Sequence, residues 1–253
     1  MTREQAILQL RAAGCVFAED EAAVLAEAAA DDAAMRRLVG RRCAGEPLEQ
    51  VVGHADFCGV RVRLRPGVFV PRIRSELLVR LAVAEAGGRP DPLVVDLCCG
   101  SGALGLAVRH RLPGITLHAA DLDPVAVACA RDNLGGNVHQ GDLFDALPAE
   151  LRGRITVLLA NVPYVATRHL PFLPAEARDH EPVTALDGGD DGLAVFRAVL
   201  AGARTWLAPH GLLLSEITGA QAGAAVAAVD ENGLTSAVST DDDLDARVIT
   251  ARR

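Results

Sequence analysis

The chain has 253 residues, 50% of them hydrophobic, and a formal net charge of −8. This length and apolar content are enough to bury a large core, as one long domain or as a domain with a small appendage. The acidic balance argues against a large phosphate-binding surface, and so against a protein built to wrap nucleic acid.

The apolar stretches predict no membrane segment. Arg or Asp interrupts them repeatedly, whereas a membrane-spanning helix needs about 20 mostly apolar residues in a row. The opening sequence MTREQAILQL also lacks the charged-then-apolar layout of a signal peptide. We therefore expect a cytoplasmic protein.

Six cysteines and seven histidines are spread along the chain without the spacing of a metal site. No two cysteines form a C-x-x-C pair, and no histidine stands at a ligand spacing from them. We interpret the cysteines as buried free thiols and expect no metal cofactor.

The first fifty residues predict a small helical domain. Apolar residues recur at spacings of three and four positions over residues 5–13, 21–30 and 33–42. Alanine and charged residues dominate this part, which is typical of a small bundle rather than of a catalytic core. We assign residues 1–50 to this domain.

Residues 51–72 predict a linker built around a β-hairpin. Apolar and polar residues alternate on both sides of Gly59, and a Pro-Gly pair follows as a turn signal. Arg61, Arg63 and Arg65 share one face of the second arm. We interpret that face as solvated rather than as a binding stripe.

From residue 73 to residue 253, strands and helices alternate. The predicted strands are residues 93–97, 116–120, 155–159 and 211–217, and the predicted helices are residues 75–86, 124–133, 192–207 and a last one ending near 232. Two final runs, residues 234–239 and 246–251, predict a closing hairpin. This order is typical of the α/β class, with a parallel sheet, helices on both faces and antiparallel strands at its end.

A glycine turn follows the first of these strands, in LVVDLCCGSGALGLA. Asp96 interrupts a run apolar enough for a central strand, and ligands bind at the carboxyl edge of such a sheet. Gly100 and Gly102 permit a sharp turn into a helix whose first N–H groups are free. Because Cys98 replaces the first glycine of the dinucleotide fingerprint, the turn alone leaves open a nucleoside-type ligand or a plain connection.

Acidic residues follow the next strands. Asp121 ends the second strand about twenty positions after the turn, where a carboxylate commonly accepts both hydroxyl protons of a ribose. Asp123 suits a helix cap better, since a proline follows it. Asp142 follows a third strand and either accepts from an exocyclic amine or caps a helix, and Leu143 and Phe144 are candidate walls for a flat ring.

The sharpest signal is N-V-P-Y, residues 161–164, after the fourth strand. Pro163 fixes its own φ and holds Val162 extended, so that the Asn161 amide and the Val162 carbonyl point in fixed directions. Such a pair accepts both N–H protons of a planar NH₂ group and leaves its lone pair facing an electrophile, with Tyr164 packed on its plane. A purely structural Asn-x-Pro turn is the alternative.

Together these motifs resemble a class I S-adenosylmethionine-dependent methyltransferase. The flanking sequences narrow the resemblance to the HemK/PrmC family of protein glutamine N5-methyltransferases, which modify the GGQ glutamine of peptide-chain release factors. They are GEPLEQVVGHADFCGVRVRLRPGVFVPR and EPVTALDGGDDGLAVFR. The resemblance spans residues 45–217 and implies a Rossmann-like methyltransferase domain over residues 73–253, with a substrate-binding helical domain before it.

By position, the resemblance also implies the site residues. The implied cofactor-binding residues are Asp96, Cys98, Cys99, Gly100, Ser101, Gly102, Asp121, Asp142, Leu143 and Asn161. The implied substrate-binding residues are Arg72, Asn161, Val162, Pro163 and Tyr164, with Asn161, Pro163 and Tyr164 as the catalytic ones. The implied reaction is in-line transfer of the methyl group from S-adenosylmethionine to the amide nitrogen, without metal or covalent intermediate, leaving S-adenosylhomocysteine.

Two departures from the family lie beside the expected substrate. The family usually has Pro where Val162 stands, so the loop gains an N–H. The motif P-R-P-x-T-E reads PRIRSE over residues 71–76, keeping Arg72 and Glu76. Methyl transfer is therefore a firmer expectation than the release-factor acceptor, and the alternative acceptors are another protein amide or an amine of a small natural product.

Other classes remain open at this point. Motifs of this type also serve adenine N6-methyltransferases acting on nucleic acid, against which the acidic balance weighs. A dinucleotide oxidoreductase needs the missing glycine, and a binding module without catalysis would follow if Val162 disables the loop. We expect a monomer, with residues 166–191 as a lid over the substrate and the motifs E-P and D-G-G within it ordering that loop.

Overall fold

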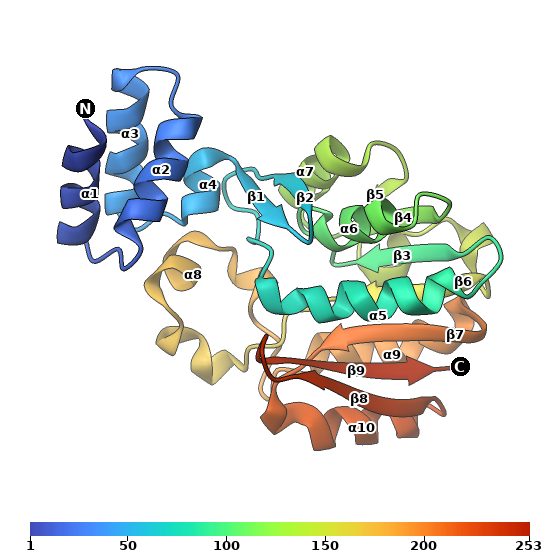
Figure 1. The fold of residues 1–253 in the computed structure, drawn as a ribbon. Helices are drawn as coiled ribbons and strands as arrows, with labels where there is room; N and C mark the ends of the chain where they lie inside the picture. The colour runs from blue at the N-terminus through green and yellow to red at the C-terminus, as the bar shows by residue number, and fades with distance from the viewer.

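A seven-stranded sheet forms the centre of the molecule, and the computed structural model describes all 253 residues around it. The strand order is β5-β4-β3-β6-β7-β9-β8 (Figure 1). The parallel strands are β3 (Leu93–Leu97), β4 (Thr116–Asp121), β5 (Val138–Gln140), β6 (Ile155–Ala160) and β7 (Leu207–Glu216). The closing hairpin is β8 (Thr235–Asp241) and β9 (Ala246–Arg252), of which β9 pairs antiparallel with β7. The predicted α/β sheet with antiparallel strands at its end is confirmed.

Helices cover both faces of the sheet. One face carries α5 (Glu76–Gly87), α6 (Ala103–Arg111) and α7 (Pro124–Leu134), and the other carries α9 (Ala194–Trp206) and α10 (Ala222–Glu231). Successive side chains of a strand point to opposite faces, so that Val94 packs in one core and Val95 in the other. This double burial explains why the strands read as continuous apolar runs.

The N-terminal helices form a small bundle that stands apart at the upper left of Figure 1. They are α1 (Arg3–Ala12), α2 (Ala18–Ala28), α3 (Asp32–Cys43) and α4 (Leu48–Val52). Leu10, Leu25 and Val39 are fully buried in a core of their own, which Val51 joins from α4. The short α4 is absent from the prediction and runs across the predicted boundary at residue 50, ending at Gly53 in a left-handed conformation.

The predicted hairpin follows, as β1 (His54–Phe57) and β2 (Val60–Arg63), and packs against α6 and α7. Asn133 of α7 holds it, accepting from the Arg63 N–H at 2.8 Å and donating to the Arg63 carbonyl at 2.9 Å. Arg61 pairs with Asp56 at the surface, as a solvated face does.

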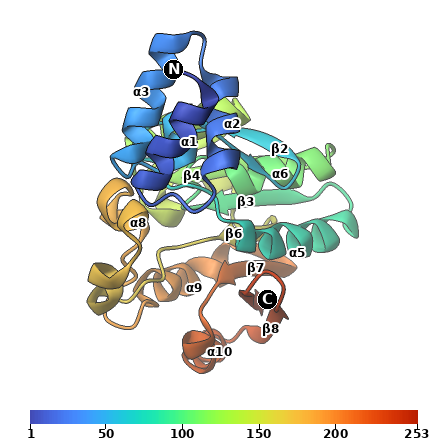
Figure 2. The same ribbon diagram turned by 60° about the vertical axis from the view of Figure 1, so that its left-hand side comes forward.

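Residues between β6 and α9 form irregular structure around α8 (Ala175–His180). Three short 3₁₀ turns lie in or near it, η1 (Ile73–Ser75), η4 (Thr167–Phe172) and η5 (Val183–Ala185), and three more lie elsewhere, η2 (Leu143–Ala146), η3 (Ala149–Leu151) and η6 (Gly219–Gln221). Both ribbon views place α8 beside the helical bundle (Figure 2). Arg42 of α3 contacts it through an ion pair with Glu176 at 2.6 Å.

All six cysteines are free. Only Cys99 and Cys129 are buried, and the other four are half-buried, so the expectation of buried thiols holds for two of them. None of the helices combines the length and the apolar character that crossing a bilayer requires.

Candidate active site

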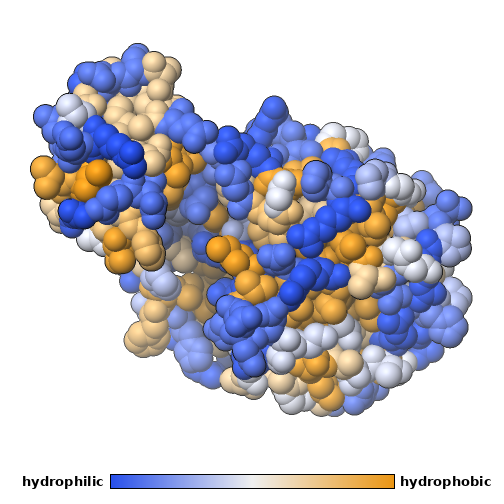
Figure 3. Space-filling view, in the orientation of Figure 1, coloured by the Kyte–Doolittle hydropathy of each residue, from blue (hydrophilic) through white to orange (hydrophobic).

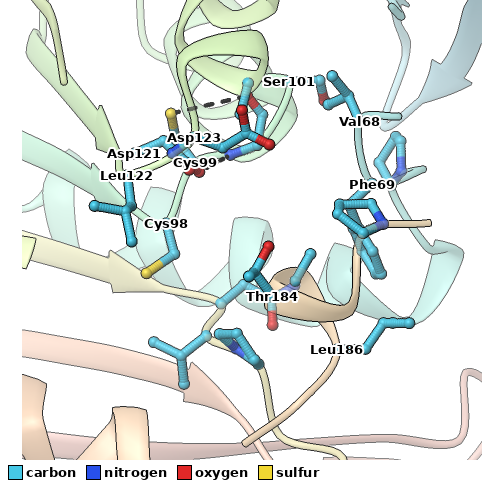
Figure 4. Close-up of a pocket in the computed structure, with 18 of the residues that line it drawn as sticks. Val68, Phe69, Cys98, Cys99, Ser101, Asp121, Leu122, Asp123, Thr184 and Leu186 are labelled. Carbon is cyan, nitrogen blue, oxygen red and sulfur yellow. Dashed lines mark hydrogen bonds between the residues drawn. The ribbon is translucent and has the colours of Figure 1, made fainter. Parts of the chain in front are cut away.

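A cavity of about 860 Å³ opens at the carboxyl ends of β3, β4 and β6. The chain runs outward from β3 to β5 on one side and from β6 to β7 on the other, and open α/β sheets bind ligands at such a reversal. In the space-filling view a recess separates the projecting helical bundle from the sheet domain (Figure 3). Figure 4 shows Asp121, Leu122 and Cys98 on one side of the cavity, with Val68 and Phe69 across from them.

The glycine turn after β3 supplies one wall. Cys98 and Gly100 have positive φ values of 53° and 55°, and a Cβ built on Gly100 would meet nothing within 4 Å. Cys98, Cys99, Gly100 and Ser101 all line the cavity. Gly102 does not line it. A Cβ there would lie 2.8 Å from the Leu134 side chain, so this glycine is needed for the packing of α6 on α7.

Asp96 lies behind this turn and also does not line the cavity. It is 1% exposed, and its Oδ2 accepts from the Gly105 N–H of α6 at 2.9 Å. Its Oδ1 has no partner, and burial raises the pKa of the carboxyl to about 7. The structure therefore gives Asp96 the role of fixing the first turn of α6.

Asp121 connects the turn to the end of β4. Its Oδ2 accepts from the Gly100 N–H at 2.8 Å and its Oδ1 from the Asp123 N–H at 2.9 Å. Burial raises the pKa of Asp121, which lines the cavity. Each carboxylate oxygen keeps a further lone pair for a hydroxyl donor. Asp123 caps α7 by accepting from the Val125 N–H at 2.7 Å, as expected.

Of the residues that follow β5, some line the cavity and one lies in the core. Asp142 is exposed and Leu143 half-buried, and both line the cavity. The expectation that Phe144 walls a flat ring is wrong, because it is buried against α9 and stacks on Trp206 with ring centroids 5.5 Å apart. The short η2 turns consecutive side chains to different sides.

The N-x-P-Y segment forms the opposite wall, and all four of its residues line the cavity. The Asn161 Nδ2 donates to the Ser75 Oγ at 3.3 Å, while its buried Oδ1 has no partner. The Val162 N–H also makes no hydrogen bond. The Tyr164 hydroxyl donates to Glu216 at 2.5 Å and accepts from Arg74 at 2.7 Å, and burial raises its pKa.

A glycine-rich turn supports this segment from behind. A Cβ on Gly188 would lie 2.6 Å from the Pro163 carbonyl oxygen, and one on Gly192 would lie 2.3 Å from that of Tyr164. Gln221 donates to the Tyr164 carbonyl at 2.9 Å. The turn itself is ordered by Asp187 and does not line the cavity, consistent with the ordering role expected for the D-G-G motif.

Arg72 lines the cavity but is engaged within the chain. It pairs with the buried Glu181 at 2.6 Å and lies 4.9 Å from the Phe69 ring. Glu181 also accepts from the Val70 N–H at 3.1 Å, which ties the segment after β2 to the loop before α9. That segment brings Val68 and Phe69 into the cavity, and its sequence carries no signal for this beyond alternation.

The fold and the cavity define a class. The structure resembles that of ribosomal protein L11 methylase from Lactobacillus delbrueckii subsp. bulgaricus, with a TM-score of 0.54 at 17% identity over 76% of this chain and 84% of that one. The model of the family described as "Methyltransferase small domain" matches residues 59–172. The protein therefore has the fold of a class I S-adenosylmethionine-dependent methyltransferase.

Two relatives of known name show where the chain belongs among methyltransferases. Release factor glutamine methyltransferase from Streptomyces coelicolor is 36% identical over 197 residues, which cover 76% of this chain and 70% of the relative. The chain belongs to the family of release factor glutamine methyltransferases. A 4-amino-L-phenylalanine/4-methylamino-L-phenylalanine methyltransferase from Streptomyces pristinaespiralis is 39% identical over 186 residues, 70% of this chain and 63% of that one.

The groups on the cavity wall fit S-adenosylmethionine. Asp121 offers lone pairs for a ribose diol, and the backbone at Gly100 faces open space. Ala103 and Leu104, at the start of α6, line the same cavity, and their amide N–H groups have no partner in the chain, so that they are free to bind a carboxylate. When bound, the cofactor supplies an electrophilic methyl group on a sulfonium.

Proposed function

We propose that the protein methylates the side-chain amide of a glutamine, and that its acceptor is the GGQ-type glutamine of a peptide-chain release factor. One observation carries the proposal: Asn161 lines the cavity, and its Oδ1 is buried without a hydrogen-bond partner. A buried acceptor left unpaired costs about 1–3 kcal/mol. An N–H of the substrate amide would satisfy this oxygen and remove that cost.

The segment would orient the acceptor for transfer. The Asn161 Oδ1 and the Val162 carbonyl each take one N–H of the NH₂ group, which turns the nitrogen lone pair toward the methyl donor. Pro163 holds the two acceptors in register, and the anchored Tyr164 ring closes the side of the cavity. Arg72 would complete the substrate side of the cavity, and the glycine turn after β3 would complete the cofactor side. Asp142 and Leu143 would face the adenine.

The same proposal covers partner and place. The helical domain, residues 1–50, would hold the release factor beside the cavity, because α8 lines the cavity and is in contact with α3. The protein would act as a monomer in the cytoplasm, where release factors work. The identity shared with the release factor methyltransferase of Streptomyces coelicolor supports this acceptor.

A second acceptor, an aromatic or aliphatic amine of a small molecule, is favoured by one observation. The unpaired Val162 N–H adds a donor where the family usually has proline. This donor would bind an acceptor atom of the substrate other than the reacting nitrogen, whose lone pair must face the methyl group. The 4-amino-L-phenylalanine methyltransferase of Streptomyces pristinaespiralis acts, by its name, on such an amine.

The test measures methyl transfer from labelled S-adenosylmethionine to purified release factor, with the GGQ glutamine intact or replaced. We expect labelling that is lost with the glutamine. A parallel reaction offers 4-amino-L-phenylalanine, and calorimetry measures cofactor binding. Cofactor binding with labelling of the amine alone would refute the glutamine acceptor in favour of the second one.

A further inference from the structure

Glu216 is a buried carboxylate at the end of β7 that collects three donors from the substrate side of the cavity. It is 3% exposed. Its Oε1 accepts from the Tyr164 hydroxyl at 2.5 Å and from the Arg74 Nε at 2.7 Å, and its Oε2 accepts from the Ser75 hydroxyl at 2.8 Å. Glu216 does not line the cavity, so it can affect the reaction only through the residues that it contacts.

The carboxylate dictates the direction of the hydrogen bonds around it. A carboxylate can only accept, so the single hydroxyl proton of Ser75 is committed to Glu216. The Ser75 Oγ then has only lone pairs left for its other neighbour, Asn161. It must therefore face the NH₂ end of that side chain, which lies at 3.3 Å.

This assignment turns the oxygen of the Asn161 amide away from Ser75, where it is buried and unpaired, on a residue that lines the cavity. The two ends of an asparagine amide are nearly equal in shape, and the hydrogen-bond network decides which way they face. With the opposite orientation, an NH₂ group would confront the NH₂ group of the acceptor. Such a pair has no proton acceptor between its two members.

We infer that Glu216, acting through Ser75, is a positioning residue that fixes the polarity of the Asn161 amide toward the methyl acceptor. The inference rests on the proposed function in taking that acceptor to be an NH₂ group. The same carboxylate holds the Tyr164 hydroxyl, so one buried charge sets both the acceptor oxygen and the aromatic wall. Arg74 balances the charge through the ion pair with Glu216.

The variant Glu216→Gln tests this polarity. Its new NH₂ group can donate to the Ser75 Oγ, which frees the Ser75 hydroxyl to donate to Asn161 and lets the amide turn over. We expect cofactor affinity to be unchanged and kcat to fall at least about tenfold, the equivalent of one lost hydrogen bond. The matched control is Glu85→Gln, which alters a carboxylate paired with Arg89 and Arg252 away from the cavity and should keep kcat.

The orientation is read directly by nuclear magnetic resonance on protein labelled with ¹⁵N-asparagine, without any substrate. In the wild type the Nδ2 protons of Asn161 should show a nuclear Overhauser contact to the β protons of Ser75. Glu216→Gln should lose it. Persistence of the contact in Glu216→Gln would overturn the inference, whatever the methyl-transfer assay gives.

A second background separates polarity from simple support. In Asn161→Asp, both ends of the side chain are oxygens, so turning it over changes nothing for the acceptor. Adding Glu216→Gln to this variant should lower its residual kcat by less than about twofold, against about tenfold in the wild-type background. An equal loss in both backgrounds would show that Glu216 only supports the fold. Glu216→Gln could lose the nuclear Overhauser contact while the wild type methylates no amide. That result would support the inferred polarity and refute the proposed function.

Discussion

Asp96 is buried behind the cavity wall at a cost in free energy. A carboxylate that is 1% exposed, with one oxygen unpaired, has exchanged full hydration for one backbone hydrogen bond. Burial, the largest cause, raises its pKa from 3.8 to about 7, and the neighbouring Asp121 adds to the rise. In return, the hydrogen bond from the Gly105 N–H to Asp96 fixes the start of α6, directly after the glycine turn that follows β3.

The pKa of Asp96 makes a prediction about pH. The unfolded chain loses this proton near pH 3.8, whereas the folded chain holds it up to about pH 7. The free energy of unfolding therefore falls as pH rises between these two values. A rise of about three pKa units corresponds to roughly 4 kcal/mol at most. Asp96→Asn has no such proton. Urea unfolding of both proteins should therefore show the variant gaining on the wild type with rising pH, and parallel curves would contradict the buried, protonated carboxyl.

At the scale of elements, the sequence predicts those helices and strands that are long enough to show a regular spacing of apolar residues. Residues 93–97 are apolar because both faces of β3 are covered, and this predicted strand coincides with the observed one. The five-residue α4 is too short to repeat an apolar spacing and is missed. Contacts across the sheet are equally invisible in one sequence. Gly102 needs Leu134 to explain it, and Phe144 needs Trp206.

The candidate site divides in the same way. Asp121 and the N-x-P-Y segment stand at strand ends, so their convergence on one edge follows from parallel pairing. Glu216 also ends a strand, yet no local pattern marks it. Its role depends on Ser75, 141 positions away in sequence. The carboxyl end of β7 was the only signal that could have pointed to it.

The glycine turn behind the substrate segment gives a prediction at this scale. Gly188→Ala would place a methyl group 2.6 Å from the Pro163 carbonyl oxygen and must displace one of the two backbones. Because Pro163 holds the acceptor groups, we expect kcat to fall by about tenfold or more while cofactor affinity by calorimetry stays unchanged. Gly223→Ala is the matched control, since its methyl group meets nothing within 4 Å. Equal kcat in the two variants would contradict the supporting role.

At the scale of the molecule, one arginine joins the helical bundle to the wall of the cavity. Arg42 is 8% exposed and pairs with Glu21 of the bundle and Glu176 of α8, each at 2.6 Å. Both partners, Glu21 first, raise its pKa further above an already high value. Because α8 also lines the cavity, the bundle and the wall are mechanically connected at this point. A substrate held by the bundle would thus act on the cavity through α8.

The pair between Arg42 and Glu176 makes the last prediction. Glu176→Ala removes it, while alanine is at least as good a helix former as glutamate. Glu176 is half exposed, so solvent screening limits the loss to about 1 kcal/mol, or up to about fivefold faster amide hydrogen exchange in α8. The control is Asp179→Ala, whose partner Arg178 lies on the same helix. Hydrogen exchange in α8 should rise in the first variant only, because the second leaves the contact with α3 intact. An equal rise in both would mean that α8 is held by its own helical charges and not by the bundle.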